Sequence, residues 1–346
     1  MNNNELRLKN VGEIVILKGF VNNKRKFKGK TFIDLRDREG ITQLIVNQDT
    51  SNITKESVIK ISGEVVKRIE FNKDISTGEV EVFVSDLEII SIAKQIPFEI
   101  NKKIDINENL RLEYRYLDLR RKKMYENLLL KSKVKNSFIN FLSKKRFLDV
   151  ETPSLSKITP EGARDFIVPT RNKGKFFSLP QSPQIYKQLL MIGGIEKYFQ
   201  FVKVFRDEDM RKDRQPEFTQ LDMEMSFHTP EMIQKLIEKM FLKLGKDIKR
   251  EIKTPFLKMD YLDAMERFGS DKPDLRFENE IKDVTNYFKK SFFKIAKMSE
   301  SVKYIFIDKK LSNKQKNLKK QLKKMVLEDF YELIIIMIII KIKDLQ

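Results

Sequence analysis

The chain has 346 residues, a formal net charge of +19 and no cysteine. This length suggests two or three domains. The absence of cysteine excludes disulfides, thiol nucleophiles and cysteine metal ligands, and the single histidine, His228, argues against a Ser-His-Asp triad. Catalysis would therefore depend on carboxylates, lysines, arginines and a metal ion held by oxygen ligands.

The charge and the hydropathy pattern limit the partners of the chain. A surplus of positive charge attracts polyanions such as nucleic acids, although lysine is abundant throughout and part of the charge is compositional. The segment Met1–Glu5 is polar and lacks the apolar core of a signal peptide. The apolar run Leu333–Ile340 is far shorter than the roughly 20 residues that span a bilayer. We expect a cytoplasmic protein that does not enter membranes.

Residues 10–91 predict a small β-barrel. Lys30–Asp37 alternates apolar and polar residues, which is the pattern of a half-buried strand. Five strands in about 80 residues are typical of a closed OB-type barrel. The five candidates are Val15–Val21, Lys30–Asp37, Ile41–Val46, Val58–Val66 and Glu79–Ile90.

A basic loop, Asn22–Lys30, contains one aromatic residue and lies next to the strand that carries Phe32. OB barrels bind single-stranded nucleic acid with cations that follow the phosphates and aromatic rings that stack on the bases. The alternative is a solvated hairpin tip with Phe32 in the barrel core. The residues alone do not decide between these interpretations.

Beyond a linker at residues 92–108, a helix is predicted over residues 124–146. Two polar clusters bounded by prolines follow, Thr159–Phe166 and Leu179–Gln188. A bound amino acid needs a partner for its ammonium group and a cation for its carboxylates. Glu161 suits the first requirement and Lys187 the second.

Two further strands are predicted at Tyr198–Arg206 and Phe218–Met225. In the second strand Phe218, Gln220, Asp222 and Glu224 share one face, and the other face is largely apolar. Placing a glutamine and two carboxylates in a hydrophobic sheet costs free energy unless they line a site. We therefore favour a functional interpretation of this face.

In this order, the segments resemble class II aminoacyl-tRNA synthetases. Phe147–Leu155 is similar to motif 1 of that family, and the two strands are similar to motif 2. Thr159–Phe166 and the Gln-Ser-Pro-Gln run at residues 181–184 are typical of aspartyl enzymes. The resemblance extends over about residues 5 to 280, with further matches at Phe32–Asp37 and Tyr114–Arg120. Several long motifs in the right order are far more specific than one short match.

The resemblance implies an α+β protein with three parts. An OB-type anticodon-binding β-barrel with its linker would occupy residues 1–105. An incomplete class II synthetase catalytic domain, an antiparallel sheet with flanking helices, would occupy residues 106–270. Residues 271–346 would be the start of an insertion domain with a divergent tail. The implied reaction is the activation of L-aspartate with ATP and the transfer of aspartate to tRNA(Asp). Whether tRNA(Asn) is also charged stays open, and motif 1 implies a homodimer.

The resemblance also implies roles for individual residues. Arg206 would be the catalytic residue, because it would hold the α-phosphate and stabilise charge during attack by the aspartate carboxylate. The implied ATP-binding residues are Arg206, Asp207, Glu208, Gln215 and Phe218. The implied aspartate-binding residues are Glu161, Ser182, Gln184, Lys187, Gln220 and Asp222. The implied anticodon-binding residues are Arg25, Phe32 and Gln43.

The C-terminal part of the sequence departs from the family pattern. After Ser270–Arg276 the family would provide Mg²⁺-binding carboxylates, an arginine for the aspartate side chain and a glycine-rich motif 3, but no glycine follows Gly269. We assign no metal ligand and expect a truncation or frameshift, with little aminoacylation by this chain alone. The alternatives are an inactive tRNA-binding remnant and a general OB-fold nucleic-acid binder. Adenylate formation would separate the ligase from both.

Overall fold

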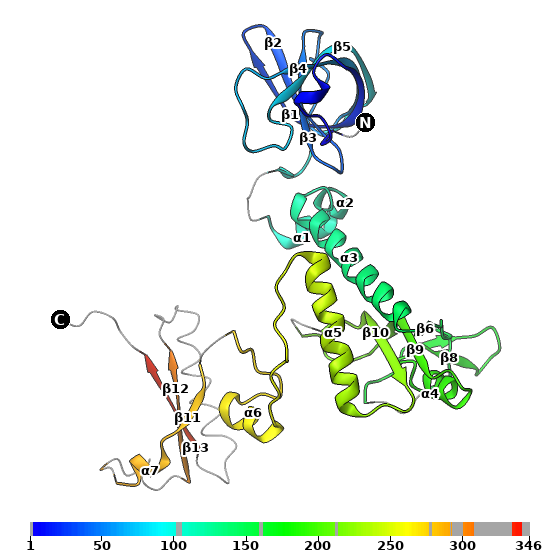
Figure 1. Cartoon of the computed structure of the whole chain (residues 1–346), viewed down its shortest axis with the longest axis vertical. Coiled ribbons are helices and arrows are strands. Elements are labelled where there is room, and N and C mark those ends of the chain that lie inside the picture. The colour runs from blue at the N-terminus through cyan, green and yellow to red at the C-terminus, as the bar shows by residue number, and fades with distance from the viewer. Residues whose placement is uncertain are drawn as a thin grey trace. The chain divides into compact units, whose positions relative to one another are not determined.

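The computed structural model describes residues 3–101, 106–158, 162–211, 214–276, 279–290, 292, 300–307 and 334–340 (Figure 1). The contacts between residues divide the chain into two compact units. One comprises residues 1–229 and 243–250, and the other comprises residues 230–242 and 251–346. Among the described residues, no helix is both long and apolar enough to cross a membrane.

A closed five-stranded barrel follows a short 3-10 helix, η1 (Leu8–Asn10). Its strand order is β1-β2-β3-β5-β4, and it confirms the predicted OB-type barrel. Inward-facing side chains such as Val21, Leu35 and Leu44 are fully buried and form its core. The strands are β1 (Ile14–Phe27), β2 (Lys30–Arg36), β3 (Ile41–Val46), β4 (Val58–Lys67) and β5 (Val80–Ser91).

The basic segment that was predicted as a loop is mostly strand. β1 continues past Val21 and pairs with β2 up to Phe27, which lies opposite Lys30. Only Lys28 and Gly29 connect the strands, with φ angles of 48° and 79°. Positive φ at both central residues is the geometry of a type I′ turn, whose twist matches that of the flanking strands. The basic residues therefore lie on a fixed hairpin.

Three helices follow the barrel: α1 (Glu108–Glu113), α2 (Arg115–Asp118) and α3 (Lys122–Lys144), of which α3 confirms the predicted long helix to within two residues. The carboxylate of Glu56, on the barrel, has only 2% of its side chain exposed. It accepts hydrogen bonds from Arg36 at 2.7 and 2.9 Å and from Arg120 at 2.8 Å. The Arg120 guanidinium also lies 4.3 Å from the Phe20 ring centroid. A buried carboxylate thus ties the segment after α2 to the barrel.

A second buried carboxylate organises the short helices. Asp118 is fully buried, and Arg111 donates to it at 2.9 Å while Arg115 and Arg121 complete its partners. Burial by itself would raise the pKa of Asp118, but the hydrogen bonds and positive charges of the arginines outweigh it and lower the pKa below its usual value. The carboxylate therefore stays ionised.

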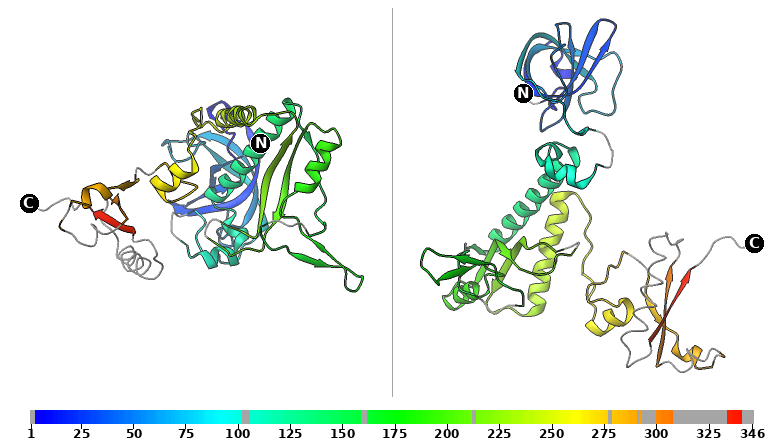
Figure 2. Two further views of the ribbon diagram at one scale, coloured as in Figure 1. Left: turned by 90° about the horizontal axis from the view of Figure 1, so that it is seen from below. Right: turned by 180° about the vertical axis from the view of Figure 1, so that it is seen from behind.

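The predicted strand pair forms two strands of a three-stranded sheet with order β10-β9-β6, in which β9 is central. Its strands are β6 (Leu148–Asp149), β9 (Lys197–Phe205) and β10 (Glu217–Met225). The helix α3 lies on one face, where Lys135 is 5.3 Å from the Phe201 ring, and α4 (Gln184–Ile192) packs on the other (Figure 2). A two-stranded sheet, β7 (Ile167–Pro169) with β8 (Phe176–Ser178), lies between motif 1 and α4 in sequence.

α5 (Pro230–Ile248) follows β10, and its C-terminal turn is bonded to α3 by Ser137, which donates to Asp247 at 2.6 Å. The second unit contains a sheet with order β11-β12-β13, in which the apolar run forms β13 parallel to β12. Residues 311–324, whose sequence indicates a basic amphipathic helix, lie outside the described residues. The elements of this unit are α6 (Tyr261–Phe268), β11 (Ile281–Asp283), α7 (Thr285–Phe288), β12 (Ser301–Ile307) and β13 (Ile334–Ile340).

We predict that Asp118→Asn lowers the free energy of unfolding by about 2–4 kcal/mol at pH 7, because three arginines lose their buried charged partner. A carboxylate whose pKa is lowered on folding contributes stability above its unfolded pKa of about 3.9, and this is lost as the pH falls through the folded value. The difference from the unaltered chain should therefore shrink below pH 4 in urea titrations. The exposed control Asp74→Asn should have no such effect, and a pH-independent difference for Asp118→Asn would contradict this explanation.

Candidate functional site

The polar face of β10 lies opposite matching positions of β9. Asp222 is paired with Gln200, and Glu224 is paired with Tyr198. Because side chains alternate along a strand and paired residues share a face, these four side chains project on the same side of the sheet. Gln220 and Phe218 continue the face, as the sequence pattern predicts. Phe218 and Asp222 are roughly 13 Å apart along the strand, and Glu224 extends the face beyond Asp222.

Lys187 binds the acidic end of this face from α4. Its Nζ lies 2.9 Å from Asp222 Oδ1 and 3.4 Å from Glu224 Oε2. The side chains of Lys187 and Asp222 are only 13% and 9% exposed, so water screens the pair weakly. Gln184 lies one turn earlier on α4, on the same side of the helix as Lys187. The cluster offers one cation and two anions to a ligand that carries both kinds of charge.

Gln200 is a residue that the sequence analysis missed. Its Oε1 accepts hydrogen bonds from the Tyr198 hydroxyl and from Thr152 Oγ1, both at 2.9 Å. Burial, and then the negative charge of Asp222, raises the pKa of Tyr198 far above its usual value, so this hydroxyl remains a neutral donor. The two donors fix the Gln200 amide beside Asp222. A glutamine within an apolar strand was the sequence signal that could have identified it.

Arg206 and Phe218 form the other end of the face. The Arg206 guanidinium lies 5.3 Å from the Phe218 ring centroid, and the Arg206 backbone donates to Pro216 O at 2.8 Å. The Arg206 Nε atom is buried and has no hydrogen-bond partner within the described structure. A buried unpaired donor is unfavourable, and an anionic oxygen would satisfy it. The pair therefore offers a phosphate-binding cation next to an aromatic ring.

The two polar clusters of the sequence are joined at the edge of the site. Gln181 is 1% exposed and donates to Ala163 O at 2.8 Å and to the Asp165 carboxylate. Asp207 N donates to Arg164 O at 3.0 Å, which connects the same loop to the end of β9. Ser182 is half-buried beside Gln181. Glu161 lies outside the described residues.

Three of the predicted residues are not part of the polar face. Asp207, Glu208 and Gln215 are exposed in the connection between β9 and β10. Arg214 donates to Glu208 Oε2 at 3.1 Å. Asp207 and Glu208 follow Arg206 directly, and Gln215 precedes Pro216, which accepts the Arg206 backbone hydrogen bond. All three therefore lie in the exposed connection rather than beside Asp222.

The barrel presents a second group of candidate residues on its outer surface. The pairing register aligns Arg25, Phe32, Ile45 and Phe83 in one row across β1, β2, β3 and β5. Phe32 is half-buried and lies outside the barrel core. The row is thus a mainly apolar, partly exposed platform with a cation at one end.

A polar row lies beside this platform. Gln43 Nε2 donates to Glu81 at 2.9 Å, while Arg68 and Arg25 donate to Gln43 Oε1 at 2.7 and 3.4 Å. Burial raises the pKa of the Glu81 carboxyl group. The sequence analysis missed Arg68 and Glu81, because only the pairing of β5 with β3 and β4 brings them to Gln43.

Two protein-family models match the chain, one over the barrel and one over the part that carries the β10 face. Residues 107–337 match the model for class II tRNA synthetases (D, K and N), and residues 15–90 match the OB-fold nucleic acid binding domain. The chain belongs to the class II tRNA synthetases of the D, K and N group. The family assignment confirms the resemblance that the motifs suggested.

Curated relatives of this synthetase chain are aspartate–tRNA ligases. The ligase of Mycoplasma capricolum subsp. capricolum is 50% identical over 319 residues, which cover 90% of this chain and 56% of the relative. The ligase of Streptococcus agalactiae serotype V is 47% identical, with the same coverage. The chain thus spans little more than half the length of these relatives.

Solved structures agree with the fold. The asparaginyl-tRNA synthetase from Pyrococcus horikoshii, complexed with asparaginyl-adenylate, has a TM-score of 0.64 and 26% identity, covering 71% of this chain and 57% of that one. The Entamoeba histolytica asparaginyl-tRNA synthetase has a TM-score of 0.63 at 21% identity, covering 77% and 65% of the two chains. The second similarity supports the fold alone.

We predict strong energetic coupling between Lys187 and Asp222 in this synthetase chain. In a double-mutant cycle of Lys187→Met and Asp222→Asn, the coupling should be about 1–3 kcal/mol, because either single change leaves a shielded charge unpaired. Lys203 of β9 and Glu217 of β10 provide the control, since they form an ion pair on the same sheet but are 58% and 52% exposed. Their coupling should be below about 0.5 kcal/mol. Equal coupling in both cycles, measured by urea unfolding, would contradict the structural description of Lys187.

Proposed function

We propose that the chain belongs to an aspartate–tRNA ligase, which activates L-aspartate with ATP and transfers it to the 3′ end of tRNA(Asp). The observation that carries this proposal is the position of Lys187 between Asp222 and Glu224, on the strand face whose other end bears Arg206 and Phe218. Cation and carboxylates suit the amino acid, and arginine and aromatic ring suit a nucleotide. The identity of about 50% with curated aspartate–tRNA ligases supports it.

In the proposed complex, Lys187 binds the side-chain carboxylate of L-aspartate. Lys187 is already paired with Asp222 in the structure. The side-chain carboxylate of the substrate would therefore join an ion cluster that is in place before binding. Glu161 would pair with the ammonium group. The remaining polar residues expected to surround the amino acid are Ser182, Gln184 and Gln220, and Gln200 would hold the position of Asp222 from the neighbouring strand.

ATP would lie at the other end of the face. Arg206 would bind the α-phosphate with its guanidinium group, and the Phe218 ring would stack on adenine. The aspartate carboxylate then attacks phosphorus, and pyrophosphate leaves. No enzyme nucleophile is needed, because positioning and stabilisation of charge by Arg206 lower the barrier. Asp207, Glu208 and Gln215 would approach ATP from the exposed connection.

Mg²⁺ accompanies ATP in the reaction that we propose. Within the ranges that the structure describes, no group of three or more histidine, aspartate or glutamate side chains could hold a metal ion. The described residues therefore do not form a Mg²⁺ site by themselves.

The barrel would recognise the anticodon of tRNA(Asp), with tRNA(Asn) as a second candidate substrate. A base would stack on Phe32, and Arg25 and Gln43 would contact base edges or the backbone. Arg68 and Glu81 join this group, because they hold the Gln43 amide by both its ends. This role in translation would place the protein in the cytoplasm.

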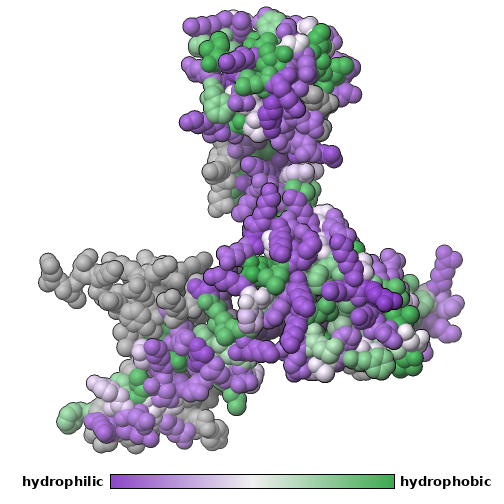
Figure 3. Space-filling view, in the orientation of Figure 1, coloured by the Kyte–Doolittle hydropathy of each residue, from purple (hydrophilic) through white to green (hydrophobic). Residues whose placement is uncertain are grey.

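We also propose a homodimer formed through the motif 1 region. Tyr125, Leu128 and Leu129 of α3 and Leu148 of β6 are between 37% and 53% exposed, which is unusual for such large apolar side chains in one region. Apolar side chains are visible on the surface of the part that carries β6, β8 and α4 (Figure 3).

The proposed ligase has three domains in this chain. They are a barrel with its linker at residues 1–105, a catalytic domain at residues 106–270 and an insertion domain from residue 271.

A second candidate function is tRNA binding without ligation. The observation in its favour is that the barrel closes around a complete core of its own and carries the anticodon platform on its outer face. Anticodon recognition would then require none of the residues of the β10 face.

We predict that the chain binds L-aspartate at least roughly tenfold more tightly than L-asparagine, because the amide cannot form the charge-assisted contact with Lys187. Lys187→Met should abolish this preference in calorimetric titrations. The control Lys203→Met should retain it, since Lys203 is exposed and pairs with Glu217. Equal affinity for the two amino acids would contradict the proposed ligase and leave tRNA binding as the function.

We predict that the chain binds tRNA(Asp) more tightly than the same tRNA with a changed anticodon, and that Phe32→Ala weakens binding roughly tenfold through lost stacking. Fluorescence anisotropy at fixed salt measures both effects. The control is Ile16→Ala, which removes an exposed side chain of β1 and should leave affinity unchanged. Indifference to the anticodon would overturn anticodon recognition by the barrel.

A further inference from the structure

The sheet of the second unit ends in a strand that is paired on one side only. β13 pairs with β12 in parallel over its whole length, from Ile334 opposite Ser301 to Ile340 opposite Ile307. Among the described strands, none pairs with the other edge of β13 (Figure 1). A free strand edge presents a row of backbone N–H and C=O groups, to which a strand of another chain can bind. The edge of β13 is therefore a candidate interaction surface.

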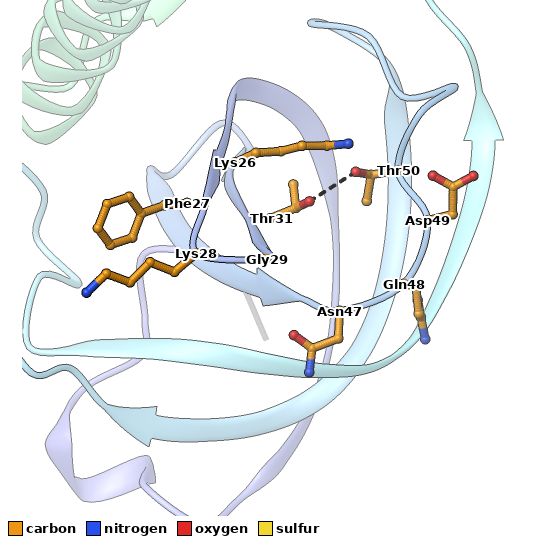
Figure 4. Close-up of a pocket in the computed structure, with 9 residues that line it drawn as sticks. All are labelled: Lys26, Phe27, Lys28, Gly29, Thr31, Asn47, Gln48, Asp49 and Thr50. Carbon is orange, nitrogen blue, oxygen red and sulfur yellow. Dashed lines mark hydrogen bonds between the residues drawn. The ribbon is translucent and has the colours of Figure 1, made fainter.

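The barrel of the first unit differs in this respect, because its five strands close on themselves. Near the tip of the β1–β2 hairpin, a pocket of about 430 Å³ lies between the strands and the segment that follows β3. There the hydroxyls of Thr31 and Thr50 are hydrogen-bonded at 3.3 Å (Figure 4). Lys24 Nζ also donates to Thr50 O at 2.8 Å. The segment after β3 is thus bonded to both strands of the hairpin, whereas the strand order of the β13 sheet is open.

The opposite edge of the β13 sheet is poorly suited to binding another strand. β11 has only three residues, Ile281–Asp283, of which the last two are charged and exposed. The Thr285 backbone donates to the Asp283 carboxylate at 2.8 Å, where α7 begins. Arg267 of α6 donates at 2.7 Å to Glu280, which directly precedes β11. Short, charged edge strands resist the addition of further strands. A new strand is therefore favoured at β13.

The sequence of β13 suits a partner that is identical to it. The strand consists of three isoleucines, Met337 and three further isoleucines, so it reads the same in both directions. It carries no charge and has a high β-propensity, which are properties of segments that pair with other chains. Two copies related by a two-fold axis exchange equivalent contacts. Antiparallel pairing centred on Met337 would place every isoleucine of one strand opposite an isoleucine of the other.

The charges that flank β13 in the sequence favour this antiparallel direction. Residues 328–332, before the strand, include two glutamates and one aspartate but no lysine or arginine. After the strand come Lys341 and Lys343, followed by Asp344. Antiparallel pairing brings the acidic side of one copy to the basic side of the other, whereas parallel pairing brings like charges together. A second copy of the chain therefore complements the strand in both hydropathy and charge.

We propose that β13 pairs with the β13 strand of a second copy of this chain, antiparallel and in a register centred on Met337. The two three-stranded sheets then form one continuous sheet whose outer strands are both β11. Because β11 resists further addition, the assembly closes as a symmetric pair. This interface belongs to the second unit, and it does not depend on the homodimer proposed for the motif 1 region.

The test places charges at Met337 in the full chain and measures the mass by analytical ultracentrifugation. Met337→Lys puts two positive charges opposite each other at the two-fold axis, and Met337→Glu puts two negative charges there. Each variant alone should have about half the mass of the unaltered chain or less. Mixed in equal amounts, the two variants should recover the mass of the unaltered chain, because each lysine then lies opposite a glutamate.

Two control variants separate this effect from a general effect of charge or sequence. Met337→Leu keeps the strand uncharged and should retain the full mass. Leu262→Lys adds a charge on α6 of the same unit, at a side chain that is 78% exposed, and should also retain it. Urea unfolding followed by circular dichroism verifies that each variant is folded. The ratio of masses is decisive, since any pairing through motif 1 contributes equally to all of these chains.

Three results would overturn the inference. If both charged variants keep the mass of the unaltered chain, β13 is not an interface. If each folded variant loses mass but their mixture does not recover it, the two copies of residue 337 do not lie opposite each other. If the unaltered chain forms long fibrils that bind thioflavin T, the sheet does not close as a pair.

Discussion

The ion cluster of Lys187, Asp222 and Glu224 is the constraint on which the arrangement of the synthetase part depends. A shielded lysine needs partners, and the strand supplies two carboxylates at alternate positions. This fixes α4 against one face of the β9–β10 pair, so the apolar side chains of β10 must face α3. The same alternation carries the polar face along β10 to Phe218 and Arg206. One strand thus aligns the Lys187 ion cluster with the pair of Arg206 and Phe218, the two ends of the proposed site.

Buried polar contacts also stabilise the outer surface of the barrel. An exposed row of apolar and aromatic side chains normally favours aggregation, but here a buried polar row lies beside it and stabilises it. Gln43 is held by Arg68 and Glu81, and its amide orientation is therefore fixed. Glu56, which Arg36 and Arg120 bind, ties the following segment to the same barrel. In both places a buried polar side chain with two or more partners holds the structure in position.

The sequence predicted the elements whose periodicity is strong. The five barrel strands, the long helix and the two faces of β10 follow from alternation of apolar residues at periods of 2 and 3.6. The extension of β1 to Phe27 was missed, because Asn22–Lys26 carries no apolar alternation and pairs only through the turn at Lys28 and Gly29. Local chemistry of the turn, rather than hydropathy, determines that part of the hairpin.

The candidate site could be predicted only in part, for a physical reason. Lys187 and Asp222 were recognisable from residue type and family motif, but the distance between them depends on how α4 packs on the sheet. Arg68 and Glu81 act through contacts that only the pairing of the strands creates, and no local pattern marks them. Gln200 does stand out as a glutamine in an apolar strand, but its partner Thr152 lies far away in the sequence. The residues that hold others in position are therefore the ones that sequence reasoning misses.

The most direct measurement is the affinity of the chain for a stable aspartyl-adenylate analogue, because this ligand spans both ends of the β10 face. If the face is one continuous site, the analogue binds far more tightly than L-aspartate or AMP alone, and Arg206→Ala and Lys187→Met each weaken binding at least tenfold. An analogue that binds no better than its separate halves, or that is indifferent to both substitutions, would contradict the proposed site.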